Sequence, residues 1–250
     1  SCPACGGTGN FDRHALCWRC RKSMAAFSDA VCRLCGKPFL EGNNFDDEPG
    51  ERKVLQFPMR RACGECLRKK PPFAALRSFG AYEGKLRAVV HAFKYGADFS
   101  CGDFLAGLLR KTLEKNASLL EEGTVVTYVP SHWTRRLARG FEPTRFLAKQ
   151  FASRAGFPFA RLLRKKRRTP SQVGLPLRER ERNVRGAFAP SMRMRRRPPQ
   201  RVLLIDDVCT TGATARACAR ALRRSGAREV AVLTAARTLP RSFSADQIFH

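Results

Sequence analysis

Eight of the eleven cysteines stand in pairs separated by two residues, all near the start of the chain. The pairs are Cys2 and Cys5, Cys17 and Cys20, Cys32 and Cys35, and Cys63 and Cys66. Two thiolates at this spacing can face one tetrahedral ion, and two such pairs complete a closed four-sulfur zinc site. The eight ligands therefore predict two structural Zn²⁺ sites, with no coordination position open for a reaction.

Neighbouring pairs along the chain combine most simply. This arrangement puts Cys2, Cys5, Cys17 and Cys20 on one ion and the other four cysteines on a second. A cross-braced arrangement, first pair with third and second with fourth, stays open, as does an iron–sulfur cluster with the same ligands. Disulfides are disfavoured because the chain shows no secretory segment, and a redox couple would explain one pair but not four.

A second group of reactive side chains lies between Val202 and Thr214. Four apolar residues precede Asp206 and Asp207, and a Thr- and Gly-containing stretch then leads into an apolar helix. This pattern predicts a buried strand that ends in a polar, ligand-binding turn. The turn residues are Thr210, Thr211, Gly212, Ala213 and Thr214.

The chemistry of this turn suits a sugar phosphate. Backbone N–H groups at the start of a helix lack helical partners and lie at the positive end of its dipole, so they favour a phosphate dianion. The two carboxylates suit ribose hydroxyls instead, with Mg²⁺ nearby to shield them. A generic strand with a solvated acidic turn is the alternative, but a helix cap rarely needs two acids.

The elements around these residues alternate between strands and helices. Apolar periodicity predicts a strand or hairpin and then a helix over 76–95, a helix over 102–120, a strand over 125–129, a helix over 143–156, a helix over 213–225 and a strand over 229–234. Strand, helix and strand in this order predict an α/β fold with a parallel sheet flanked by helices and right-handed crossovers.

A cationic loop over residues 130–141 follows the strand at 125–129 and carries Arg135, Arg136 and Arg139. Ligands of doubly wound sheets bind where loops leave the carboxyl ends of the strands, so this loop and the acidic turn should share one crevice. The three guanidinium groups are predicted to bind pyrophosphate through charge-assisted hydrogen bonds. A solvated basic loop is the alternative.

The formal charge of +27 is concentrated in one segment, because residues 161–201 hold 15 Arg and Lys against two Glu. Such a field favours polyanions, either a pyrophosphate-bearing substrate or nucleic acid. The basic runs lack interleaved aromatic residues, so we expect phosphate contact rather than base stacking there.

Length and composition predict one main domain and one small one, since 250 residues with 43% hydrophobic content can bury a full core. We expect a double zinc ribbon at 1–70, the α/β domain at 71–238 and a tail at 239–250, with a hinge at Pro71-Pro72. No apolar run approaches the roughly 20 residues that span a bilayer, and no leader is apparent, which predicts a cytoplasmic protein.

The stretch from Val202 to Thr214 resembles the signature of the type I phosphoribosyltransferases, which bind phosphoribosyl pyrophosphate (PRPP). The resemblance implies a catalytic role for Asp206 and Asp207 on the ribose, the 5′-phosphate on residues 210–214, and pyrophosphate with Mg²⁺ on the loop arginines. It also implies a mobile lid over 163–199.

Further motifs resemble those of the ComF competence-protein family, which is associated with DNA uptake and natural transformation. They are Cys63-Gly64-Glu65-Cys66 up to Pro71-Pro72-Phe73, Tyr82-Glu83-Gly84-Lys85 before Phe93-Lys94-Tyr95-Gly96, and Val129-Pro130 with Arg139-Gly140-Phe141. The family usually continues the last motif with Asn-Gln, where this chain has Glu142-Pro143, a change expected to repel phosphate.

This resemblance implies a PRPP-binding, phosphoribosyltransferase-like protein that is connected with DNA uptake and the proteins of the uptake machinery. It implies pentosyl transfer as the reaction and leaves the acceptor unknown. The alternative is a non-catalytic module that holds single-stranded DNA on its basic surface and zinc ribbons.

Overall fold

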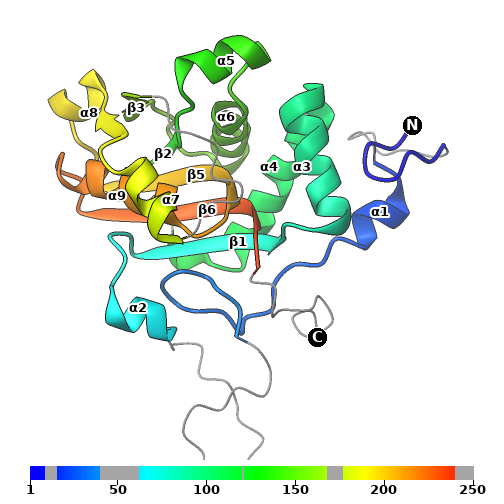
Figure 1. Cartoon of the computed structure of the whole chain (residues 1–250), viewed down its shortest axis with the longest axis horizontal. Coiled ribbons are helices and arrows are strands. Elements are labelled where there is room, and N and C mark those ends of the chain that lie inside the picture. The colour runs from blue at the N-terminus through cyan, green and yellow to red at the C-terminus, as the bar shows by residue number, and fades with distance from the viewer. Residues whose placement is uncertain (9–15, 40–61, 120, 168–176, 240–250) are drawn as a thin grey trace, which may run out of the picture.

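The structure, a computed structural model, describes residues 1–8, 16–39, 62–119, 121–167 and 177–239 (Figure 1). At its centre lies a four-stranded sheet in the order β1, β6, β5, β2, in which every neighbouring pair is parallel. The strands are β1 (Ala75–Ala81), β2 (Thr124–Tyr128), β5 (Arg201–Cys209) and β6 (Glu229–Arg237). Parallel neighbours require crossover connections, which the intervening helices supply. The predicted α/β class is therefore confirmed.

Helices cover both faces of this sheet (Figure 1). One face packs against α3 (Gly84–Gly96), α4 (Phe99–Glu114) and α6 (Pro143–Ala155). The other face packs against α9 (Ala213–Arg223). Beside α9 lie the antiparallel pair β3 (Leu163–Lys165) and β4 (Phe188–Pro190), with α7 (Leu177–Val184) and α8 (Met192–Arg196).

The apolar run of β5 is explained by these two layers. Leu203 and Ile205 belong to the core under α4 and α6, whereas Val202 and Leu204 belong to the core under α9. Successive side chains of a strand point to opposite faces, so a strand covered on both sides needs apolar residues at every position. The polar residues of β5 are consequently confined to its ends.

The Cys-rich module, described over residues 1–8, 16–39 and 62–68, contains the short helices α1 (Trp18–Lys22) and α2 (Gly64–Arg68). Its first cysteine group packs in the core formed with α3 and α4, and the segment that follows lies along β1 at the edge of the sheet (Figure 1). Backbone N–H groups of Leu76 and Phe27 donate to the carbonyls of Leu34 and Phe79 at 2.8 and 2.7 Å. Gly36 has φ +66°, and a Cβ there would collide with the Leu76 carbonyl. The module thus covers backbone groups that an edge strand would otherwise expose.

Several expected boundaries differ from the structure. The helix expected over 102–120 is α4 followed by the single 3₁₀ turn η1 (Ala117–Leu119). The expected cationic loop contains the helix α5 (Trp133–Arg139), which the side chain of His132 caps by accepting from Thr134 N–H. Of the predicted lid, residues 168–176 lie outside the described part, as do residues 240–250 of the predicted tail. Within the described ranges, no helix is both long and apolar enough to cross a membrane.

Candidate ligand site and zinc centres

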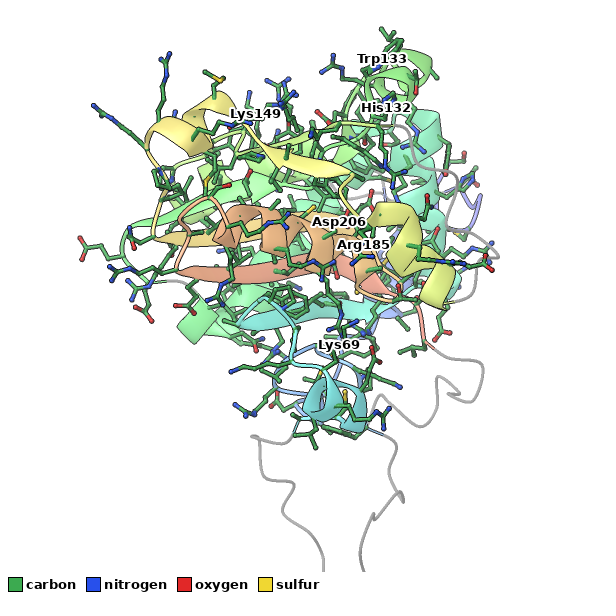
Figure 2. All side chains as sticks on the ribbon, turned by 60° about the vertical axis from the view of Figure 1, so that its left-hand side comes forward. Lys69, His132, Trp133, Lys149, Arg185 and Asp206 are labelled. Carbon is green, nitrogen blue, oxygen red and sulfur yellow. The ribbon has the colours of Figure 1, made fainter. Side chains whose placement is uncertain are left out.

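Asp206 and Asp207 lie near the carboxyl end of β5, an inner strand of the sheet, which continues past them to Cys209 (Figure 2). Each carboxylate accepts a hydrogen bond from the next backbone N–H, at 2.9 Å from Asp207 N to Asp206 Oδ1 and at 2.6 Å from Val208 N to Asp207 Oδ1. These local bonds orient two adjacent acids at the strand end, where parallel sheets bind their ligands.

Lys94, in the last turn of α3, forms an ion pair with Asp207, since its Nζ lies 2.8 Å from Asp207 Oδ1. The two side chains are only 17% and 13% exposed. Burial on its own lowers the pKa of Lys94, but the Asp207 carboxylate outweighs this and raises it. Asp207 is therefore paired with a buried cation. Lys94 stands in a family motif, but its ion pair with Asp207 was not predicted from the sequence.

Asp206 is partly buried and makes no ion pair with any residue that the structure describes. Burial, followed by repulsion from the Asp207 carboxylate, raises the pKa of Asp206 to about 8. When two carboxyl groups lie this close, ionising both is costly, and the pKa of one of them rises. Near neutral pH the pair thus holds one charged carboxylate and one carboxyl group that can donate or release a proton.

The turn after β5 consists of Thr210, Thr211 and Gly212, and α9 begins at Ala213. Gly212 has φ 75° and ψ 5°, a left-handed conformation that favours glycine, and its carbonyl accepts from Arg216 N at 2.8 Å. Ala213 and Thr214 form the first turn of α9, whose dipole has its positive end at this point. The structure therefore brings the predicted turn residues and the acid pair to one place.

The three loop arginines are distributed differently from the expectation. The Arg139 guanidinium lies 4.9 Å above the ring centroid of Tyr95, the neighbour of Lys94 on α3. Arg136 is exposed and makes no ion pair with the described residues. The side chain of Arg135 is outside the described set. Contacts thus bring only Arg139 to the helix that carries Lys94.

Glu142 faces inward. It is buried, and its Oε1 accepts a hydrogen bond from Ser131 N at 2.8 Å. Burial and then the Glu142 carboxylate raise the pKa of Tyr128 to about 12. The carboxylate therefore holds the turn that follows β2. Because it is buried and bonded to Ser131 N, it is less free to repel a bound phosphate than the sequence suggests.

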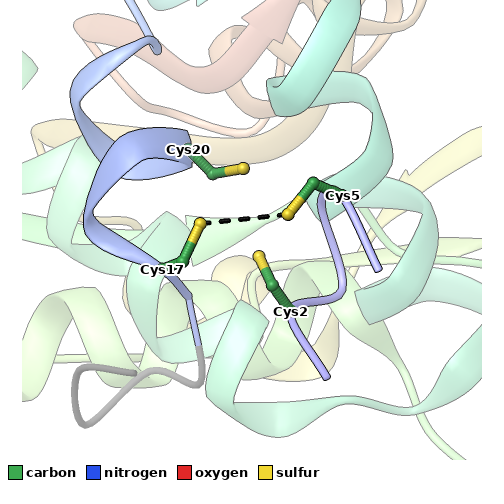
Figure 3. A group of neighbouring side chains, drawn as sticks. All are labelled: Cys2, Cys5, Cys17 and Cys20. Carbon is green, nitrogen blue, oxygen red and sulfur yellow. Dashed lines mark hydrogen bonds between the residues drawn. The ribbon is translucent and has the colours of Figure 1, made fainter. Parts of the chain in front are cut away.

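Two groups of four cysteines converge in the Cys-rich module, and Figure 3 shows the first of them. Cys2, Cys5, Cys17 and Cys20 form one group, and Cys32, Cys35, Cys63 and Cys66 form the other, with all Sγ atoms of a group within 4.8 Å of one another. The sequential arrangement is therefore the observed one, and the cross-braced alternative is wrong.

The sulfur geometry fits Zn²⁺ in both groups. The Sγ atoms of Cys5 and Cys17 lie 3.9 Å apart, and those of Cys35 and Cys63 lie 3.7 Å apart. A tetrahedron with Zn–S bonds of about 2.3 Å has sulfur–sulfur edges of about 3.8 Å. Four sulfur ligands fill a tetrahedral shell, so each ion would have a structural role.

Two buried arginines connect the second cysteine group with the turn after β5. Arg237, at the end of β6, donates from Nη1 to the Cys35 carbonyl at 2.7 Å and lies 3.4 Å from Cys209 Sγ. Arg216 of α9 donates to Glu65 Oε1 at 3.2 Å. Both arginines were missed, although a charged residue within an apolar strand or helix face was the available signal.

The fold and the side chains described define a doubly wound α/β protein with an acid pair near the carboxyl end of an inner strand and two zinc-type cysteine centres. Residues 1–67 match the family described as a double zinc ribbon domain. The cysteine geometry and this match together support two zinc ribbons.

Curated relatives extend over nearly the whole chain. Competence protein F of Haemophilus influenzae is 27% identical over 239 residues, which cover 94% of this chain and 96% of that protein. The DNA utilization protein YhgH of Salmonella typhimurium is 29% identical over 229 residues, covering 90% and 97%. YhgH of Escherichia coli K12 is 26% identical over 227 residues, again covering 90% and 97%. The chain is thus a homologue of these proteins, and the predicted resemblance to the ComF family is confirmed.

Solved structures with a similar fold are enzymes of phosphoribosyl chemistry. A glutamine PRPP amidotransferase of B. subtilis is 22% identical, with a TM-score of 0.38, and covers 58% of this chain. An orotate phosphoribosyltransferase of Aeropyrum pernix is 19% identical, with a TM-score of 0.31, and covers 60%. The chain spans 30% of the first and 64% of the second. Likeness at TM-scores this low supports no assignment of a ligand or a reaction.

Proposed function

We propose that the strand-end site binds PRPP or a closely related phosphoribosyl ligand. The observation that carries this proposal is the acid pair of β5, held directly before the glycine-capped start of α9. In this arrangement Asp206 and Asp207 receive the ribose hydroxyls, and residues 210–214 receive the 5′-phosphate at the positive end of the helix dipole.

Mg²⁺ would join the ligand at the same place. Asp206 and Asp207 supply carboxylate oxygens, which Mg²⁺ prefers, and a bound cation would favour the ionised form of Asp206. The ion would supply charge neutralisation for the pyrophosphate. Lys94 already neutralises one carboxylate. Arg139, which lies over the ring of Tyr95 on the same helix, would contact pyrophosphate, with Arg135 and Arg136 as further candidates from α5.

Transfer of the phosphoribosyl group is the reaction that such a site would carry out. A nucleophile on an acceptor would displace pyrophosphate from the anomeric carbon, and the bound anions would stabilise positive charge on the sugar. In line with the names of its relatives, we assign the chain to DNA uptake or utilization, in contact with proteins of the uptake machinery.

Isothermal titration calorimetry with PRPP and Mg²⁺ tests the ligand assignment. We expect Asp206→Asn/Asp207→Asn to weaken binding by about tenfold or more, because Asp207 loses its charge and neither residue can then offer a carboxylate to the ribose hydroxyls or to Mg²⁺. The matched control is Glu114→Gln/Glu122→Gln, which removes two exposed carboxylates elsewhere and should bind like the wild type. Wild-type protein that fails to bind, or binding that is indifferent to the first pair of changes, would refute the assignment.

A second candidate function is the binding of single-stranded DNA without catalysis. It is favoured by Trp133 and Leu137 of α5, which are 58% and 69% exposed at the outer end of the molecule (Figure 2), beside the exposed Arg136. An exposed indole next to cations offers both base stacking and phosphate contact. Trp133 of α5 thus offers an exposed aromatic ring, which the basic runs in residues 161–201 lack.

A titration with a labelled oligothymidylate over a salt series tests this candidate. Trp133→Ala should weaken binding by about tenfold, because stacking contributes on the order of 1–3 kcal/mol per base. Trp18→Ala is the matched control, since Trp18 is equally exposed, at 59%, on α1. Equal losses in the two variants would show that α5 has no special part in binding, and no binding at about 0.1 M salt would remove the nucleic-acid function.

A further inference from the structure

A cavity lies between the Cys-rich module and the sheet, apart from the strand-end site. Its volume is about 350 Å³, within the range of about 300–1,000 Å³ that small-molecule sites occupy. Its lining comes from residues 24–31 between the two cysteine groups, from Gly36, from Arg77 to Phe79 of β1, and from Lys111 to Asn116 at the end of α4 and just after it. None of these residues belongs to the strand-end site.

Arg77 is held rigidly at this cavity. Its Nε donates to Asn116 Oδ1 at 2.9 Å, and its Nη1 donates to the carbonyls of Arg33 and Leu76 at 3.1 and 3.0 Å. The Nη2 group makes no hydrogen bond, and the side chain no ion pair, with the residues that the structure describes. Burial lowers the pKa of Arg77. The side chain is thus a desolvated, oriented cation with donor capacity left over.

Two more cations line the same cavity from another element. Lys111 and Lys115 stand one helical turn apart at the end of α4, both are exposed, and neither pairs with a carboxylate among the described residues. The negative end of the α4 dipole favours lysines in a last turn. The thiolates of Cys32 and Cys35 act against the effect of burial on the pKa of Arg77 and so favour its charged form. Asp29 is the single acid among the lining residues, so the cavity carries a net positive charge.

Apolar side chains line the cavity as well. Met24, Phe27 and Val31 contribute from the segment between the two cysteine groups, and Phe79 contributes from β1. A cavity lined by both cations and aromatic and aliphatic side chains matches a ligand that has an anionic group and a ring.

We propose that this cavity binds a small organic phosphate of mononucleotide size. The phosphate lies on Arg77, Lys111 and Lys115, because a guanidinium and two ammonium groups give charge-assisted hydrogen bonds to its oxygens. The ring packs against Met24, Phe27 and Val31. The site is separate from the acid pair of β5 and does not depend on PRPP binding there.

Calorimetry with AMP as the probe tests the proposal. Lys111→Met/Lys115→Met should weaken AMP binding by about tenfold or more, and both lysines are exposed, so the variant should unfold at the wild-type temperature. Lys85→Met/Lys149→Met removes the same charge from exposed positions that do not line the cavity and should change affinity by less than about twofold. Adenosine, which lacks the phosphate, should bind far more weakly than AMP to the wild type.

A third variant distinguishes the two sites. AMP binding should survive in Asp206→Asn/Asp207→Asn, whatever that variant does to PRPP binding. The proposal is overturned by the absence of saturable AMP binding, by equal losses in the two lysine pairs, by adenosine binding as well as AMP, or by loss of AMP binding in the aspartate variant.

Discussion

Among single side chains, Asp206 is set apart by its burial, which raises its pKa more than the neighbouring Lys94 lowers it. Lys94 neutralises Asp207 at 2.8 Å, and Asp206 is left with a raised pKa of about 8. One fixed charge and one titratable carboxyl group therefore stand side by side. A ligand that brings Mg²⁺ should bind with release of a proton from Asp206 below about pH 8.

Protein stability should reflect the same group. Because the pKa of Asp206 is about 8 in the folded protein and ordinarily 3.8, its proton favours the folded state at low pH, and this contribution is lost as pH rises through about 8. Asp206→Asn should therefore gain stability relative to the wild type as pH increases from 5 to 9. Urea denaturation across this range measures the difference. A difference that stays constant with pH for Asp206→Asn would contradict the raised pKa.

Removal of Lys94 should expose the cost of an unpaired buried charge. Lys94→Met should lower the free energy of unfolding by about 3 kcal/mol, because Asp207 keeps its burial and loses its partner. Lys94→Met/Asp207→Asn should recover much of this loss. Chemical denaturation of both single variants and the double variant gives the coupling free energy, and strictly additive effects would count against the pair.

Among the elements, β5 and α9 could be predicted because local sequence determines them. A strand covered on both faces is apolar over its covered length, which in β5 runs from Val202 to Ile205, and the Gly212 turn separates the strand from the helix. The helix α5 was missed, because its charges and the preceding Pro130 resemble a loop and its cap comes from His132, a less common capping residue. Lys94 could not be assigned a partner, since packing of α3 against the sheet decides what it reaches.

The contact of β6 with the second cysteine group should be measurable. Arg237→Met removes the donor to the Cys35 carbonyl and should speed zinc release from one of two ions, detected with a colorimetric chelator. It should also lower the free energy of unfolding by about 1–3 kcal/mol, the cost of a buried acceptor left unpaired.

Arg154→Met is the matched control for this prediction. Arg154 also donates to a backbone carbonyl, that of Asp103 at 2.9 Å, but on α6 and away from the cysteines. Its zinc release should follow the wild type. Similar release from both arginine variants would mean that Arg237 does not support the second centre.

For the whole molecule, loss of zinc should change how the chain associates. We expect two zinc ions per chain by elemental analysis. Their removal by a chelator should loosen the module from β1, uncover an edge strand and cause self-association that added zinc reverses. Light scattering after size-exclusion chromatography measures the change. Stripped protein that stays monomeric would show that the module does not protect this edge.

The position of β6 in the sheet also bears on how the chain folds as it is made. β6 lies between β1 and β5, and Arg237 at its end bonds to a carbonyl 202 residues earlier. The ribosome therefore releases the cysteine module and β1 long before their partner strand exists. The N-terminal cysteines can bind zinc early. The module can pack against a completed sheet only after β6 has left the exit tunnel.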